Sequence, residues 1–221
     1  LDLFVPQDGV CKLFKGDGKG KFTDVTAKAG DLSKSSGQAT CGAWGDSHND
    51  GRLDLVVGCL KGPNRFFRNK GEGVFEDATE EVGLSRRVYN TQAICLVDLN
   101  NDGVLDMVFN NEAQESCVLL GNPEWGQKMT PLVVQVKGKD GVLGSRVRVL
   151  DREGKLHGSH TVSGGDGRGG QASPTARFAL KPGTYRVEVE YSTRLRRARE
   201  VTVASAYPRG TIDQSTPQAS Q

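Results

Sequence analysis

Short apolar runs separated by glycine-rich polar turns recur along the first half of the chain. Leu53–Cys59 is almost continuously apolar, as expected for a strand buried on both faces. The pattern predicts three further strands at Gln38–Trp44, Asn64–Arg68 and Val74–Thr79, and Gly71-Glu72-Gly73 marks a turn between the last two. About 50 residues therefore hold four short strands.

These strands belong to a repeating unit. LDLFV (1–5), LDLVV (53–57) and LDMVF (105–109) are versions of one strand, and their starts are 53 − 1 = 52 and 105 − 53 = 52 residues apart. Ala27–Gly30 and Glu80–Leu84 are expected to be short helical or turn links between the units. A period of roughly 50 residues with several short strands is typical of a β-propeller blade.

The second half has a different pattern without this repeat. Five segments alternate or cluster β-forming residues between Gly-rich or Pro-rich turns: 132–138, 145–151, 176–180, 184–192 and 199–204. They predict a small antiparallel β-sandwich. The expected fold is all-β: about two propeller blades over 1–124, a sandwich over 129–205, and a polar, disordered tail over 206–221.

Composition narrows the functional classes. The 221 residues carry a net charge of +2, with 29 glycines and 25% charged residues. This balance excludes a fully disordered chain and argues against a nucleic-acid-binding protein, and no apolar run reaches the roughly 18 residues of a membrane span. Residues 1–128 carry 14 basic and 19 acidic side chains, whereas 129–221 carry 15 and 8, which favours two domains with different roles.

The five cysteines form no zinc-binding pattern. Cys41, Cys59 and Cys95 lie in apolar strand-like runs, where buried thiols are common. We therefore expect thiols, with disulfides as the alternative.

The loop between Asp98 and Asp106 contains candidate metal ligands. Side-chain oxygens stand at its positions 1, 3, 5 and 9, glycine stands at position 6, and position 7 can offer a carbonyl. That donor set suits Ca²⁺, and the alternative is a turn without metal. An EF-hand is excluded because position 12 is Phe109 and the flanks are strands. The expected ligands are Asp98, Asn100, Asp102, the Val104 carbonyl and Asp106.

A second loop repeats this pattern 52 residues earlier. Its expected ligands are Asp46, His48, Asp50, the Arg52 carbonyl and Asp54. Imidazole is a poor Ca²⁺ ligand, so the loop is expected to bind more weakly or through water at His48. Asp2 corresponds to position 9 of a third loop. In each case Ca²⁺ is expected to stabilise a tight turn.

The segments GDSHNDGRLDLVVG, NRFFRNKGEGVFEDATEEVGL and VDLNNDGVLDMVFNN resemble the FG-GAP/VCBS repeats of integrin-like β-propellers over roughly residues 1–122. The resemblance implies Ca²⁺ at the loops above, with His48 as the departure from the family's ligand set. It also implies further blades upstream and an extracytoplasmic setting: extracellular, cell-surface or periplasmic.

Gly144–Val149, Val162–Gln171 and Arg177–Leu180 are similar to the ASPIC/UnbV domain, which follows FG-GAP repeats in proteins related to cartilage acidic protein. Lys139-Asp140 replaces the usual Asn-Arg pair. Gly165-x-Gly167-x-x-Gly170 fits a dinucleotide fingerprint, but Pro174 and a strand follow where a helix is required, so a loop is expected.

Four arginines in the second half form a basic run, interpreted as a solvated hairpin or as a patch for an acidic glycan or protein: Arg194, Arg196, Arg197 and Arg199. His157 and His160 are expected at the surface, without a nucleophile signature. These observations favour a non-catalytic, calcium-binding module for adhesion or for binding a protein or glycan. The alternatives are a carbohydrate-active or other hydrolytic enzyme, or its accessory domain, that uses the propeller as a scaffold, and a purely structural part of a larger propeller.

Overall fold

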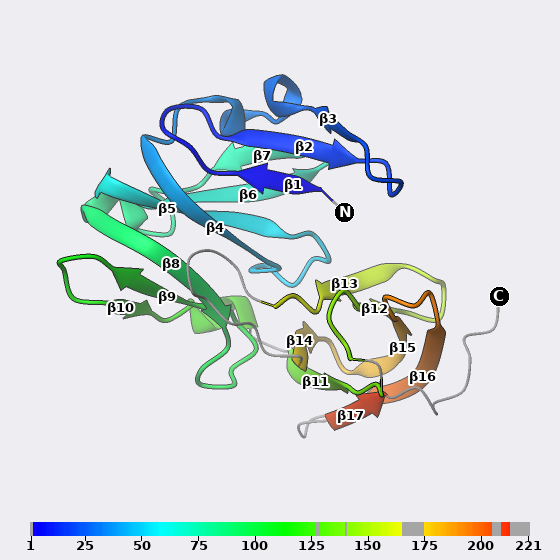
Figure 1. The fold of residues 1–221 in the computed structure, drawn as a ribbon. Coiled ribbons are helices and arrows are strands. Elements are labelled where there is room, and N and C mark those ends of the chain that lie inside the picture. The colour runs from blue at the N-terminus through cyan, green and yellow to red at the C-terminus, as the bar shows by residue number, and fades with distance from the viewer. Residues whose placement is uncertain (1, 127–128, 140, 165–174, 205–208, 213–221) are drawn as a thin grey trace.

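The computed structural model describes residues 2–126, 129–139, 141–164, 175–204 and 209–212. They form strands and 3-10 turns, with no α-helix in the described ranges. The all-β prediction is therefore confirmed. Figure 1 shows two parts, with the strands up to β10 at the upper left and β11 to β17 at the lower right.

Two sheets make up the first part. β1 (Leu3–Val5), β2 (Lys12–Gly16) and β3 (Phe22–Asp24) form one antiparallel sheet. The other has the order β10-β9-β8-β5-β6-β7, with β4 also pairing β5. Its strands are β4 (Gln38–Gly45), β5 (Asp54–Gly62), β6 (Arg65–Gly71), β7 (Val74–Asp77), β8 (Tyr89–Val97), β9 (Asp106–Asn111) and β10 (Cys117–Leu119).

These strands follow the predicted repeat closely. β4 to β7 are the four strands of one unit, and β8 to β10 are the corresponding first three strands of the next. Four short 3-10 turns, mostly between the units, are η1 (Thr26–Lys28), η2 (Asp31–Ser33), η3 (Leu84–Arg86) and η4 (Pro123–Gly126). The first part is thus a partial β-propeller of about two blades.

β5 is buried on both faces, as its apolar run predicted. Leu55 and Val57 pack into one cluster with Phe67, whereas Val56 packs into the other with Phe66. Gly58 must lack a side chain, because a Cβ there would lie 2.6 Å from the Cys41 Sγ atom. β5 therefore separates the two core clusters of the first part and contributes side chains to both.

The second part is a β-sandwich. Its three-stranded sheet has the order β14-β11-β17 and its four-stranded sheet has the order β13-β12-β15-β16. Leu132 and Val134 of the first sheet share one core with Val147 and Val187 of the second. The strands are β11 (Thr130–Val136), β12 (Arg146–Leu150), β13 (Leu156–Thr161), β14 (Thr175–Leu180), β15 (Gly183–Glu190), β16 (Arg196–Val203) and β17 (Arg209–Ile212).

Two strands of the sandwich were not expected. β13 is polar and contains Gly158, whose missing side chain makes room for the Phe178 ring. β17 pairs in parallel with β11, for example Val134 with Gly210, within the tail expected to be disordered. The sequence of β17 has only a weak strand pattern. The strand forms because its backbone groups find hydrogen-bond partners along β11. The Gly165–Gly170 loop lies outside the described residues.

None of the five cysteines forms a disulfide in the structure. Cys11, Cys41 and Cys59 are buried. Burial raises the pKa of the Cys41 thiol, and it raises the pKa of the Cys59 thiol to about 12. Cys95 on β8 is exposed, contrary to expectation, because its side chain points away from the packed face of that strand. No helix long and apolar enough to cross a membrane occurs in the described part of the chain.

His160 was expected at the surface but lies half-buried on β13. It pairs in register with Val147 of the core, and its Nε2 has no hydrogen-bond partner among the described residues. Burial lowers the pKa of His160 below its usual value, because charging a desolvated imidazole is costly.

We expect this imidazole to make the chain less stable in mild acid. The unfolded chain takes up a proton below about pH 6.5, whereas the folded chain resists it, so stability present above that pH is lost on acidification. Urea denaturation of His160→Leu at pH 7.5 and 5.5 should show a smaller loss than the wild-type chain shows. An equal loss in both proteins would exclude His160 as the cause.

Candidate metal centres

The two Asp-rich loops have the same backbone conformation at their turning points. Asn49 and Asn101, at position 4, have φ of 54° and 60°. Gly51 and Gly103, at position 6, both have φ of 85°, a region that glycine adopts without steric cost. Each loop joins consecutive strands, β4 to β5 and β8 to β9.

The position-1 aspartates accept the same backbone hydrogen bonds in both loops. The Asp98 oxygens accept from the backbone N of Asp102 and Gly103, both at 3.1 Å. The Asp46 oxygens accept from Asp50 and Gly51, at 3.0 and 2.9 Å. A carboxylate oxygen retains a second lone pair after accepting one bond, so both aspartates still have acceptor capacity.

The position-9 aspartates join each loop to the strand or turn 14 or 15 residues later. Asp54 Oδ1 accepts from the Asn69 backbone N at 2.8 Å, and Asp106 Oδ1 accepts from that of Gly121 at 2.9 Å. Asp2, the equivalent residue of the third loop, accepts from the Gly16 backbone N at 3.0 Å. The repeat seen in sequence is therefore also a repeat of hydrogen bonds.

Burial opposes ionisation of the position-1 carboxyls. It raises the pKa of Asp46 to about 6, and the nearby negative charges of Asp50 and Asp54 add to the shift. Burial also raises the pKa of Asp98, with a contribution from Asp102. Carboxylates placed this way are destabilised by one another, and a cation would relieve that repulsion.

The loops differ in what else contacts their carboxylates. Asp106 Oδ2 accepts from the Leu99 backbone N at 2.8 Å, whereas Asp54 Oδ2 lies 2.8 Å from the imidazole Nδ1 of His48. Asp50 pairs with the Arg52 guanidinium.

A basic side chain from the neighbouring strand β6 also reaches the loop at 46–54. The Arg68 Nε lies 3.3 Å from the other imidazole nitrogen of His48. Sequence reasoning missed Arg68, because it reaches the loop from β6, 20 residues away along the chain.

Of the two described loops, the one at 98–106 has the donor set that fits Ca²⁺ better. Its candidate ligands are all oxygens, and the amide of Asn100 and the carbonyl of Val104 supplement the three carboxylates. Within the described residues, no group of three or more His, Cys, Asp or Glu side chains is gathered as a metal cluster, so ion binding requires the carboxylates to reorient. At 46–54, basic groups already contact two of the carboxylates, and the fit is poorer.

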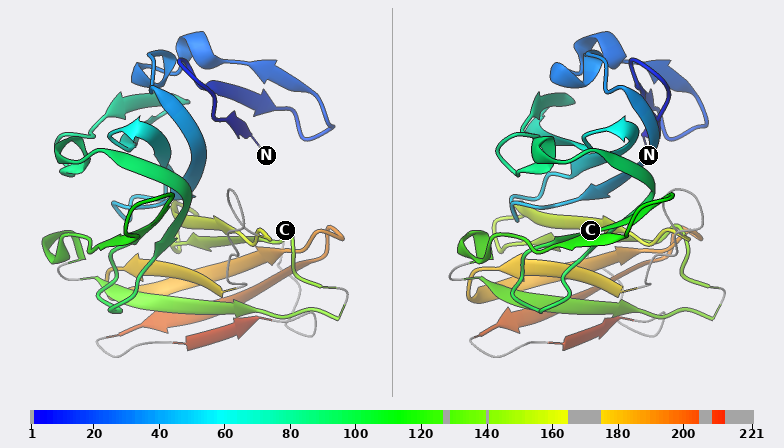
Figure 2. Two further views of the ribbon diagram at one scale, coloured as in Figure 1. Left: turned by 60° about the vertical axis from the view of Figure 1, so that its left-hand side comes forward. Right: turned by 90° about the vertical axis from the view of Figure 1, so that its left-hand side faces the viewer.

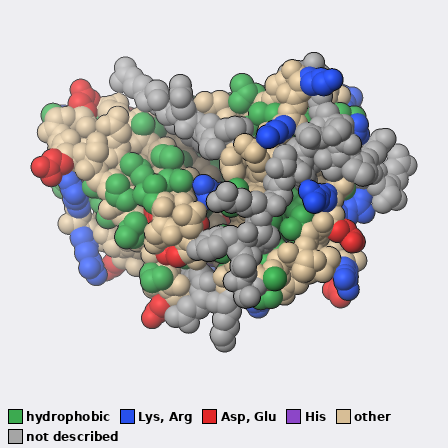
Figure 3. All heavy atoms as spheres, turned by 90° about the horizontal axis from the view of Figure 1, so that it is seen from below, with side chains coloured by type: hydrophobic (Ala, Val, Ile, Leu, Met, Phe, Trp, Pro, Cys, Tyr) green, Lys and Arg blue, Asp and Glu red, His purple; other side chains and the backbone are tan. Residues whose placement is uncertain are grey.

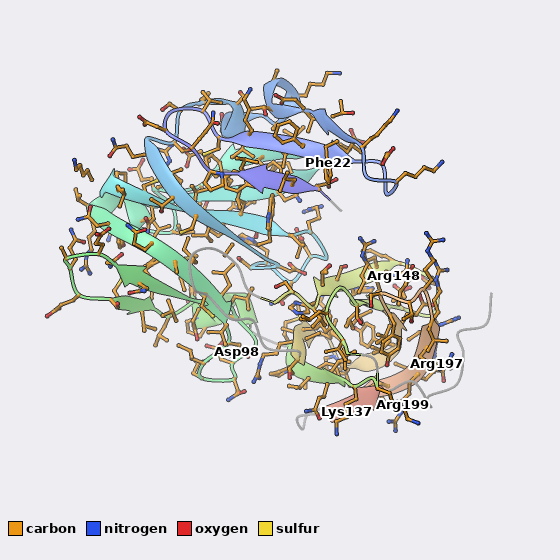
Figure 4. The ribbon with its side chains drawn as sticks, viewed as in Figure 1. Phe22, Asp98, Lys137, Arg148, Arg197 and Arg199 are labelled. Atoms are coloured by element: carbon orange, nitrogen blue, oxygen red, sulfur yellow. The ribbon has the colours of Figure 1, made fainter. Side chains whose placement is uncertain are left out.

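Both loops lie on the side of the first part that faces the sandwich (Figure 2). Asn49 Nδ2 donates to the Gly103 carbonyl at 3.0 Å, which joins the two loops. From the sandwich, Arg177 donates to Asn101 Oδ1 at 3.1 Å. Figure 4 shows Asp98 at this end of the first part, next to β14.

Strand alternation divides the predicted arginine cluster between two faces. Arg196 pairs in register with Glu190 and forms a 3.2 Å ion pair with it, whereas Arg197 and Arg199 pair with Val189 and Val187 on the opposite face. Arg194 lies in the preceding turn with φ of 65°. On the visible face in Figure 3, basic side chains are scattered among acidic and hydrophobic ones. The four arginines do not form one patch.

Comparison with known proteins identifies the repeats. The model of the FG-GAP-like repeat matches residues 1–57 and 48–109. Human cartilage acidic protein 1 is 31% identical over 88 residues, and that of Xenopus tropicalis is 33% identical over 90. These alignments cover 40% and 41% of this chain but only 13% and 14% of the relatives.

One solved structure spans nearly the whole chain at low similarity. It is described as a "putative cell adhesion protein" from Bacteroides ovatus ATCC 8483, with 14% identity and a TM-score of 0.26 over 97% of this chain and 92% of that one. A likeness at this level does not bear on fold or function.

Proposed function

We propose that this chain, whose residues 1–109 carry FG-GAP-like repeats, is a calcium-binding, non-catalytic module that binds a protein or glycan outside the cytoplasm. The loop at 98–106 carries the proposal, because its sequence has oxygen donors at the Ca²⁺-ligand positions and its backbone turn is held by hydrogen bonds to Asp98. Asp98, Asn100, Asp102, the Val104 carbonyl and Asp106 would hold the ion. Its charge would offset the repulsion between the buried carboxylates.

The surroundings of the histidines favour binding over catalysis. His48 contacts Asp54 and Arg68, and His157 Nε2 lies 2.8 Å from Asp151 and stacks edge-on against Tyr185. The third, His160, lies half-buried against the sandwich core. His48 and His157 are held by neighbouring side chains and His160 is half-buried, so a hydrolytic function has no specific support.

An extracytoplasmic setting follows from the expected affinity. Sites of this kind in extracellular modules bind Ca²⁺ with Kd of roughly 10⁻⁴ to 10⁻³ M. Such a site would be filled where Ca²⁺ is millimolar and would stay empty in the cytosol. The relationship to cartilage acidic protein 1 supports the same setting.

Calcium should raise the melting temperature of the chain. With a Kd of about 0.5 mM, about 5 mM Ca²⁺ would add about 1.4 kcal/mol, which corresponds to roughly 3 to 5 °C for a chain of this size. The measurement is thermal unfolding in EDTA and in Ca²⁺, together with calorimetric titration.

The double variant Asp98→Asn/Asp102→Asn is the control, because it keeps the side-chain size and removes two of the negative charges. Its melting temperature should not respond to Ca²⁺. Absence of both binding heat and a melting shift in the wild-type chain would overturn the calcium proposal.

A further inference from the structure

The loop at 98–106 packs directly on the sandwich. Along β14, the side chains of Ala176, Phe178 and Leu180 enter the sandwich core, so Arg177 and Ala179 point outward. Ala179 is nevertheless only 4% exposed. Gly103 covers it so closely that a Cβ on Gly103 would lie 3.0 Å from the Cβ of Ala179.

The loop at 46–54 packs on the other sheet. Among the described residues, β13 is hydrogen-bonded only to β12. Gly51 lies against the backbone of β13, because a Cβ there would approach the Leu156 carbonyl oxygen to 3.3 Å and the His157 carbonyl carbon to 3.4 Å. Both sheets of the sandwich therefore contact a loop of the first part.

The sandwich therefore rests on both loops, and the Asn49–Gly103 hydrogen bond joins them. We propose that ion binding at 98–106 and docking of the sandwich are thermodynamically coupled, so that Ca²⁺ fixes how the two parts of the chain are held together. The inference rests on the calcium site proposed above.

The coupling follows from where the contacts fall within the loop. Asn101 and Gly103, which contact the sandwich, alternate with Asn100, Asp102 and Val104, the expected ligands. An ion that fixes the ligand positions must also fix the positions between them. Each event then removes part of the ordering cost of the other, and linkage requires the effect to be equal in both directions.

The decisive variant changes the sandwich without touching a ligand. Ala179→Leu inserts a larger side chain where Gly103 now packs, while the sandwich core on the other face of β14 is unchanged. Calorimetric titration with Ca²⁺ should give a Kd raised about tenfold, within the usual range of coupling between sites. The matched control is Ala198→Leu on β16, whose side chain lies on the outward face with Glu188, and its Kd should not change.

A second pair of variants separates contact from charge. Arg177→Lys keeps a charged donor only one bond shorter, whereas Arg177→Met has neither the donor nor the charge. If the contact transmits the coupling, Arg177→Met should weaken Ca²⁺ binding by about threefold and Arg177→Lys should weaken it less. If Arg177 acts through its charge alone, Arg177→Met should bind Ca²⁺ more tightly, which would overturn this role for the contact. This pair also serves as the test if Ala179→Leu does not fold.

Hydrogen exchange of the full chain provides an independent measurement. Ca²⁺ should slow amide exchange in 156–161 and 175–180, which contain no expected ligand. If Ca²⁺ binds but neither these segments nor the Kd of Ala179→Leu responds, the coupling is wrong and the calcium site stands. If the wild-type chain binds no Ca²⁺, both proposals fail.

Discussion

Replacing Asp106 by alanine should destabilise the chain by about 3 kcal/mol even in EDTA. Asp106 is fully buried (0% exposed), and its two oxygens accept from the backbone N of Leu99 and Gly121. Without the carboxylate, two backbone donors lose their acceptor, at about 1 to 3 kcal/mol each. Urea denaturation in EDTA measures this loss separately from any effect of the ion.

Asp102→Ala is the matched comparison within the same loop. Asp102 is less buried, and its bonds to Val104 and Asn100 stay inside the loop. It should cost less than about 1 kcal/mol in EDTA, and both variants should lose the response to Ca²⁺. Equal losses in EDTA would show that Asp106 does not anchor the loop to the residues beyond β10.

Exchanging two residues should give the loop at 46–54 a calcium affinity similar to that of the loop at 98–106. His48→Asn with Arg52→Val gives it the residues that the other loop has at positions 3 and 7. The exchange also removes the imidazole from Asp54 and the guanidinium from Asp50. With a Kd of about 0.5 mM, a site is about two-thirds filled at 1 mM Ca²⁺. We therefore expect equilibrium dialysis at 1 mM Ca²⁺ to show about twice as much bound ion per chain as in the wild type.

The reverse exchange supplies the control. Asn100→His with Val104→Arg should lower the affinity of the loop at 98–106 at least tenfold, because a poor ligand and a positive charge would enter its oxygen shell. Two ions of equal affinity in the wild-type chain would show that the basic groups around His48 do not prevent binding.

The strands of the first part were predictable because their signals are local. Leu53–Cys59 is apolar along its whole length, as a strand buried on both faces must be. The 52-residue spacing then shows which segment of the next unit corresponds to each strand. For the arginine run, strand alternation was a local signal that the expectation of a single basic patch overlooked. Strand residues alternate between faces, so Arg196 and Arg197 could have been assigned to opposite sides from sequence alone.

What the sequence could not show depends on contacts between distant segments. Arg68 reaches His48 from a neighbouring strand, and Arg177 reaches Asn101 across 76 residues. β17 forms only by pairing with β11, since its own residues carry little strand signal. The sequence spacing predicted which carboxylates belong to the candidate site. The basic side chains that contact the loops come from distant segments, and only the folded structure shows them.

The three buried cysteines give the first part an internal indicator of its own opening. A thiol reacts as its thiolate, and a buried thiol is out of reach of a reagent in solution. Burial also raises the pKa of the Cys41 and Cys59 thiols. A small alkylating reagent should therefore modify exposed Cys95 at once and reach Cys11, Cys41 and Cys59 only in molecules whose blades have transiently come apart. The rate at which these three buried sulfurs are modified then reports how often the blades open, without a change of sequence.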